Sequence, residues 1–188
     1  MFPEIRRSLE RWYAAVAIQE LALAQAQQGV ADAALYLAVG RALVELAGFA
    51  DPRVVLLEYF ARILESAGRL PDVARSAATD RVFEPTEGCV VGVRDGRSFE
   101  VDHAPDRLPG GRISLDAVAR QILLRLVRSI RKPLDEVRLP DRRIVPLARL
   151  LQGMLIEWLD RRPVAFRYLR WTVQDSARSL VPSSRPKS

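Results

Sequence analysis

Apart from its arginines, this 188-residue sequence has few side chains that could carry out chemistry. His103 is the one histidine and Cys89 the one cysteine, and they flank a predicted hairpin across which they could meet. No third group is placed to orient such a pair, so we favour a packed cysteine and an exposed histidine over a nucleophilic site. A zinc site needs about four Cys or His ligands, and no phosphate-binding glycine motif occurs. The sequence therefore predicts no enzyme activity, no metal and no cofactor.

The arginines are the more informative residues, because they are unevenly distributed along the chain. The sequence has 29 Lys and Arg against 23 Asp and Glu, a net charge of +6, and Lys132 and Lys187 are its two lysines. Residues 1–104 contain 11 basic and 15 acidic side chains, whereas residues 105–188 contain 18 basic and 8 acidic. Such a basic half indicates an oriented surface for a polyanion, either nucleic acid or an acidic peptide. The alternative is that these arginines only lie on exposed, solvated faces of the protein and bind no partner.

Two groups of arginines are candidates for that surface. On a helix expected from Ser114, three arginines fall within about 80° of one another at 100° per residue, opposite much of the apolar stripe. We expect them to form a basic ridge with the neighbouring lysine: Arg120, Arg128, Arg131 and Lys132. The second group lies on both sides of Pro163 and comprises Arg161, Arg162, Arg167 and Arg170. The planar guanidinium suits both phosphate and carboxylate oxygens.

Helical periodicity predicts the elements that position these groups. Apolar residues recur at three- and four-residue steps over residues 9–28, 31–47 and 52–67, which predicts three antiparallel helices with short connections. Asp51-Pro52 is an N-terminal signal for the third of these helices, and Gly68 is a C-terminal signal. Further helices are also expected. One has Ser114 as its N-cap, another begins somewhere between Asp141 and Pro146, and a short one follows Pro163.

Between these helices the period changes to that of strands. Two short apolar runs flank Asp95-Gly96, which predicts a hairpin, because this pair favours a type I′ turn. We therefore expect a mainly α protein, a bundle of about six helices with a small β-hairpin insertion around residues 82–102. A single domain over residues 1–175 includes the insertion at 76–103, and residues 176–188 are expected to be a disordered tail.

The tryptophans allow one further set of expectations. Trp12 and Trp158 lie on apolar stripes and are expected in the core. Trp171 lies beside Arg170 near the chain end, where it could either stack on a base or pack on a helix.

The order of these elements resembles the C-terminal helical region of the RecO family of bacterial DNA recombination mediators. The resemblance covers about residues 8–172 and rests on five segments in the family's order. They are SLERWYAAVAIQELALAQAQQG (Ser8–Gly29), LLEYFARILESAGRLPDV (Leu56–Val73), VFEPTEGCVV (Val82–Val91), RISLDAVARQILLRLV (Arg112–Val127) and LIEWLDRRPVAFRYLR (Leu155–Arg170). No one of these motifs is diagnostic alone.

The resemblance implies a role and a set of partners. Such proteins bind single- or double-stranded DNA, the acidic C-terminal tail of single-stranded DNA-binding protein and a toroidal RecR-type partner, so that the RecA recombinase can load. It thus implies a DNA repair and recombination mediator that is not an enzyme. The alternative is a stand-alone adaptor that docks an acidic peptide without binding DNA.

The sequence departs from the family pattern in two ways. Relatives often carry a four-cysteine zinc knuckle, whose positions here appear as Ser76, Thr79, Gly92 and Asp95. None of these is a thiolate, so we expect no zinc. The family's N-terminal OB-type barrel has no counterpart before Ser8, which indicates either a clipped gene or a free-standing helical protein.

The lengths of the apolar stretches, the N-terminal pattern and the cysteine count indicate where the protein resides and whether it spans a membrane. No apolar stretch approaches the roughly 18 residues that a spanning helix needs, and the N-terminus lacks the secretory pattern. A single cysteine suits a reducing compartment. We expect a cytoplasmic, nucleoid-associated protein with no membrane partner.

Overall fold

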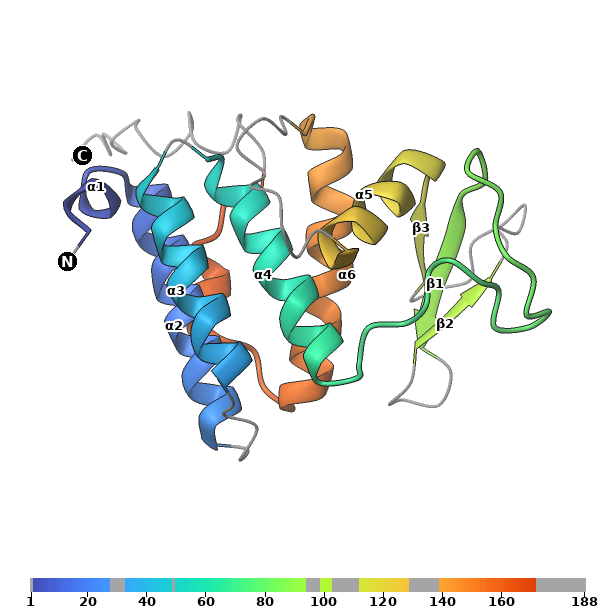
Figure 1. Ribbon diagram of the computed structural model, residues 1–188, viewed down its shortest axis with the longest axis horizontal. Helices are drawn as coiled ribbons and strands as arrows, with labels where there is room; N and C mark the ends of the chain where they lie inside the picture. Colours follow the sequence, from blue (N-terminus) through green and yellow to red (C-terminus); the bar gives the residue numbers. More distant parts are fainter. Residues whose placement is uncertain are drawn as a thin grey trace, which may run out of the picture.

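The computed structural model describes residues 2–27, 33–48, 50–93, 99–102, 112–128 and 139–171 (Figure 1). The elements in chain order are α1 (Pro3–Arg6), α2 (Leu9–Gln27), α3 (Ala33–Ala47), α4 (Pro52–Ser66), β1 (Cys89–Val93), β2 (Phe99–Asp102), β3 (Ile113–Leu115), α5 (Ala117–Arg128), α6 (Asp141–Leu159) and the 3₁₀ helix η1 (Val164–Arg167). This confirms the prediction of a mainly α bundle with a small antiparallel β insertion. No helix among the described residues is long and apolar enough to cross a membrane.

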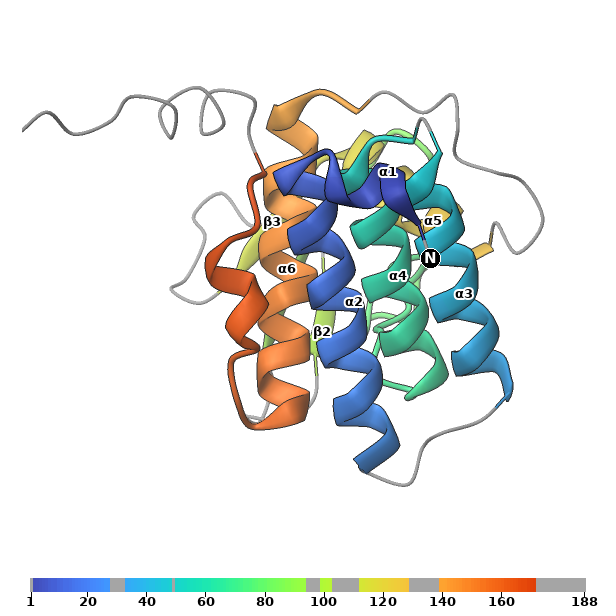
Figure 2. The same cartoon turned by 90° about the vertical axis from the view of Figure 1, so that its left-hand side faces the viewer.

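Helix α4 is the central helix of the bundle. It lies between α2 and α3 on one side and α5 and α6 on the other (Figures 1 and 2). Its residues from Val54 to Ala61 are all buried, and the Tyr59 hydroxyl donates a hydrogen bond to the Ile18 carbonyl of α2 at 3.2 Å. Nearly all of one helix is therefore removed from water, which makes α4 the scaffold on which the other helices pack.

Local signals set both ends of α4, as predicted. The Asp51 side chain accepts a hydrogen bond from the Arg53 amide at 2.9 Å, so Asp51 is the N-cap, and Pro52 opens the helix. Gly68 takes the left-handed conformation with φ of 64° just after the helix, which glycine adopts at little cost.

The sheet has the order β2-β1-β3, with both pairs antiparallel. The β1–β2 hairpin confirms the predicted insertion, although its Asp95-Gly96 turn lies outside the described residues. Strand β3 was not predicted. Ser114 pairs with Val90 in this strand and does not cap a helix, so the expected cap was wrong. Asp116 takes that role, because its carboxylate accepts a hydrogen bond from the Ala119 amide at 2.6 Å.

Hydrogen bonds close the segment that contains Ser76 and Thr79, two of the positions expected to correspond to zinc ligands. Ser76 is buried, and its hydroxyl lies 3.1 Å from an Asp102 carboxylate oxygen and accepts the Thr79 amide at 3.3 Å. Its backbone amide donates to the Arg81 carbonyl at 2.8 Å. Gly92 lies in β1 and Asp95 lies outside the described residues. Side-chain and backbone hydrogen bonds thus hold this segment together.

Trp12 and Trp158, which were both expected in the core, differ in how deeply they are buried. Trp158 is half-buried against the core, whereas Trp12 is 44% exposed, so its predicted core position was wrong. Helix α2 carries apolar side chains on both its buried and its exposed sides. Periodicity finds such a helix but cannot say which of its stripes faces inward.

Glu58 gives the bundle a pH-dependent element. It is buried between Arg62, with which it forms an ion pair, and Arg41, whose Nη2 lies 3.6 Å from Glu58 Oε1. Burial raises the pKa of Glu58 above its ordinary 4.5, and the charge of Glu45 adds to this against the opposing effect of Arg62 and Arg41.

We expect Glu58→Gln to make the free energy of unfolding less dependent on pH. The folded state binds the Glu58 proton more tightly than the unfolded state, so the stability this proton provides is present at low pH and is lost as pH rises above about 4.5. Urea unfolding at pH 4.5 and pH 7 measures the effect. The difference in the free energy of unfolding between the variant and the wild type should favour the variant more at pH 7 than at pH 4.5. An equal difference at both pH values would contradict this account.

Candidate nucleic-acid interface

The chain reverses after α6 in a segment that we call the arginine turn, residues 160–170. Asp160 ends α6 in the left-handed conformation with φ of 50°, and Pro163 precedes η1. Four arginines and one acidic residue occur in this segment. Its charge is therefore strongly positive over a short length of chain.

A carboxylate from α2 holds this turn in place. The two oxygens of Glu20 accept hydrogen bonds from the Val164 and Ala165 amides at 2.8 and 2.9 Å. These amides belong to the first turn of η1 and have no partner within that helix. Glu20 therefore provides acceptors for two backbone amides that have no partner within η1, and it fixes η1 on α2.

Aromatic contacts anchor the rest of the segment. Phe166 is buried against Phe60 of α4, with ring centroids 5.4 Å apart. The Tyr168 ring stacks on Tyr13 of α2, with centroids 5.0 Å apart and planes 16° from parallel. Trp171 meets Phe60 edge-on at 6.2 Å, so of its two possible roles the structure shows packing on a helix.

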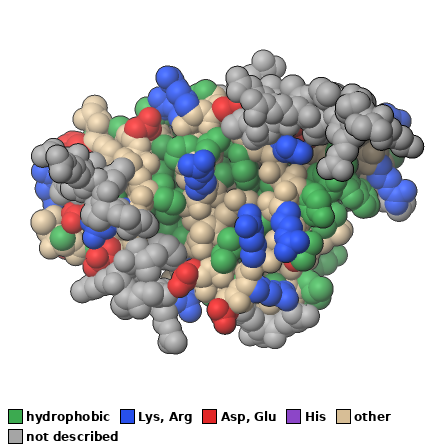
Figure 3. Space-filling model, turned by 180° about the vertical axis from the view of Figure 1, so that it is seen from behind, with side chains coloured by type: hydrophobic (Ala, Val, Ile, Leu, Met, Phe, Trp, Pro, Cys, Tyr) green, Lys and Arg blue, Asp and Glu red, His purple; other side chains and the backbone are tan. Residues whose placement is uncertain are grey.

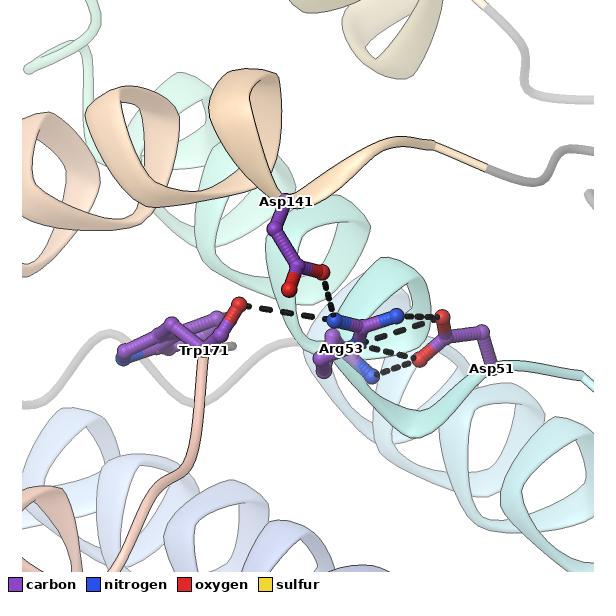
Figure 4. A network of polar contacts seen from close by, with 4 residues as sticks. All are labelled: Asp51, Arg53, Asp141 and Trp171. Atoms are coloured by element: carbon purple, nitrogen blue, oxygen red, sulfur yellow. Dashed lines mark hydrogen bonds and ion pairs between the residues drawn. The ribbon is translucent and has the colours of Figure 1, made fainter. Parts of the chain in front are cut away.

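Arg53 ties the end of this segment to the start of two helices. Its guanidinium binds the Asp51 carboxylate at 2.7 Å and Asp141, the first residue of α6, at 2.5 Å (Figure 4). The same guanidinium donates to the Trp171 carbonyl at 3.4 Å. The hydrogen bonds that Arg53 donates to Asp51, and then the one that it donates to Asp141, raise the pKa of Arg53 against the opposing effect of burial. A permanently charged arginine thus joins α4, α6 and the chain beyond η1.

The predicted site residues of the arginine turn reach the surface. Arg161, Arg162, Arg167 and Arg170 are all exposed, and the turn lies on the face of the molecule that carries α6 (Figures 1 and 2). Figure 3 shows that face, where Lys and Arg side chains gather near the centre among apolar and uncharged groups. Glu20, Arg53 and Tyr168 were missed from the sequence, because the contacts that join them to other elements are with distant residues and leave no local signal.

The second predicted group is not a surface ridge. Arg120 is 1% exposed, and its guanidinium donates to the carbonyls of Glu87 at 3.0 Å, Val73 at 3.3 Å and Glu84 at 2.5 Å. It also lies over the Phe83 ring, 5.3 Å from the centroid. Its prediction as a binding residue was wrong, because it holds the segment before β1 on α5. The side chain of Arg128, and all of Arg131 and Lys132, lie outside the described residues.

Cys89 has the character of a packed residue. It is buried, and burial raises the pKa of its thiol to about 11 although the charge of Arg120 opposes this. A neutral thiol is a poor nucleophile and a poor metal ligand. His103 lies outside the described residues. Within the described part of the chain, no three His, Cys, Asp or Glu side chains form a group that could hold a metal ion.

One comparison with known proteins found a match. Residues 6–164 match the family model described as recombination protein O C terminal. Searches of curated proteins and of solved structures returned no match. The family match spans all of the elements from α2 to α6. The chain therefore belongs to the RecO family, whose C-terminal region it contains, and its general role is in DNA recombination and repair.

Proposed function

We propose that this chain is a recombination mediator that binds DNA, the acidic tail of single-stranded DNA-binding protein, or both, through the arginine turn, and so assists RecA loading. The observation that carries the proposal is the exposure of Arg161, Arg162 and Arg167 on a turn that Glu20 fixes to the bundle. Arginines on a fixed stretch of backbone lose less conformational entropy on binding than arginines on a free one.

The chemistry of the turn favours single-stranded DNA as one ligand. Arginines contact phosphate oxygens without reading sequence. Tyr168 is 47% exposed beside them, although Tyr13 stacks on its ring. An exposed aromatic side chain within a basic cluster suits base stacking, which tolerates any sequence. The same arginines would bind the carboxylates of an acidic tail. A RecR-type partner is a further proposed contact, and it rests on family membership alone.

Replacing Arg161 and Arg162 together with alanine should weaken binding of single-stranded DNA about tenfold, since each lost contact is worth on the order of 0.7 kcal/mol. Fluorescence anisotropy with a labelled oligothymidylate measures this effect. The matched control is Arg6→Ala with Arg7→Ala, an exposed neighbouring pair in and just after α1. This control removes the same charge, so equal weakening by both pairs would contradict a role for the arginine turn.

A parallel titration separates the mediator from the adaptor. The probe is a peptide that ends in acidic residues followed by Pro-Phe. Binding of DNA, with or without the peptide, supports the mediator, whereas binding of the peptide alone supports an adaptor. Binding of neither would overturn both.

A further inference from the structure

Helix α3 has an apolar outer face that no described element covers. Its inner side packs on α2 and α4, and Figure 2 shows its other side at the edge of the bundle. Tyr36, Leu37 and Val44 on this helix are 80%, 68% and 60% exposed. The two charged residues of α3 pair with each other, Arg41 Nε to Glu45 Oε1 at 2.7 Å, and Arg41 also reaches Glu58 of α4. The charges therefore lie on the α4 side and leave the outer face uncharged.

The outer face has a repeating order of small and large side chains. It comprises Ala33, Tyr36, Leu37, Gly40 and Val44, spaced by three and four residues, as in helices that pack on another helix. Large side chains lie on both sides of Gly40, with Tyr36 and Leu37 before it and Val44 after it. A second copy of α3 running antiparallel would place Leu37 of one copy beside Val44 of the other.

Gly40 supports this arrangement independently. No atom lies within 4 Å of the position that a Cβ would take there, so nothing within the described fold requires a glycine. A glycine inside a helix destabilises it relative to alanine. A close approach of a second backbone at this point accounts for its presence, since a side chain would separate the two helices.

The exposed apolar area is that of an interface. Helix α2 lies beside α3 and adds the exposed side chains of Leu9, Trp12 and Leu23. The large apolar side chains of the two helices together expose roughly 700 Å², above the roughly 300–600 Å² patch of a typical monomer and near the roughly 800 Å² per partner of a stable interface. Because the face carries no charge, it fits an equally uncharged surface.

We propose that two copies of this chain associate through the outer faces of α3, antiparallel about a two-fold axis at Gly40, with α2 at the rim. A two-fold contact requires a self-complementary surface, and on this face large apolar side chains lie on both sides of Gly40. The arginine turn lies on the other side of α2 from α3 (Figure 2). The dimer would thus leave both arginine turns accessible.

The test is the mass of the full chain in solution, by sedimentation equilibrium at tens of micromolar. The wild type should be a dimer. Gly40→Glu should weaken dimerisation at least tenfold, because it brings two carboxylates together at the axis. The space at Gly40 is open in the single copy, so this variant should keep the wild-type circular dichroism.

Gly153→Glu is the matched control, because Gly153 is also exposed in the middle of a helix, α6, with open space around its Cβ position. This variant should remain a dimer. A monomeric wild type, a Gly40→Glu variant that remains a dimer, or equal loss of the dimer in both variants would overturn the proposal.

Discussion

Replacing Arg120 with methionine is expected to lower the free energy of unfolding by about 3–5 kcal/mol, the largest effect we expect of any single substitution. The substitution leaves the carbonyls of Glu87, Val73 and Glu84 without their donor, and it removes the contact with Phe83. Urea unfolding followed by circular dichroism measures the loss. The melting temperature should fall by roughly 10 °C.

Arg125→Met is the control for this prediction. Arg125 lies on the same helix, α5, but is exposed, so the change should alter stability by less than about 0.5 kcal/mol. Arg120→Lys should also destabilise, because an ammonium group cannot reach three carbonyls that a planar guanidinium spans. If Arg120→Met were as stable as Arg125→Met, the buried hydrogen bonds would have no structural role.

Replacing Glu20 with alanine should release the arginine turn from α2. Two charge-assisted hydrogen bonds to the Val164 and Ala165 amides are lost, and the loss in stability should be about 1–3 kcal/mol. Hydrogen exchange gives the local readout, because the two amides should lose their protection. Affinity for single-stranded DNA should fall about three- to tenfold, because the released arginines must be ordered on binding.

Gln19→Ala is the control for this second prediction, since Gln19 neighbours Glu20 on α2 and is exposed. It should leave both hydrogen exchange and DNA affinity unchanged. Glu20→Gln should fall between the two variants, because an amide has one accepting oxygen where the carboxylate has two. Unchanged protection of Val164 and Ala165 in Glu20→Ala would show that packing of Phe166 alone holds the turn.

Signals close together in the sequence predicted the parts of the fold that local chemistry determines. Asp51-Pro52 and Gly68 gave the ends of α4 because a cap and a left-handed glycine act within a few residues. The β1–β2 hairpin was predicted for the same reason. Strand β3 was missed because Ser114 is followed by helix-like periodicity, and its pairing with Val90 is a contact between distant residues.

The candidate site shows the same division between local and distant information. Exposure of the arginine turn was predictable, because arginines on both sides of Pro163 have no apolar stripe to join. Burial of Arg120 was not predictable, because the carbonyls that receive it come from residues 33 to 47 positions earlier in the chain. A helical wheel places Arg120 opposite the apolar stripe, but it does not show that another segment covers that side.

The most direct test of the central claim is the salt dependence of binding to single-stranded DNA, measured by anisotropy for the wild type and for Arg161→Ala with Arg162→Ala. Logarithmic affinity should fall linearly with logarithmic salt concentration for the wild type. The slope should be smaller by about 1.4 in the double variant, since each arginine that contacts a phosphate of single-stranded DNA contributes about 0.7. Equal slopes for the two proteins, or wild-type affinity that does not change with salt, would contradict a DNA interface at the arginine turn.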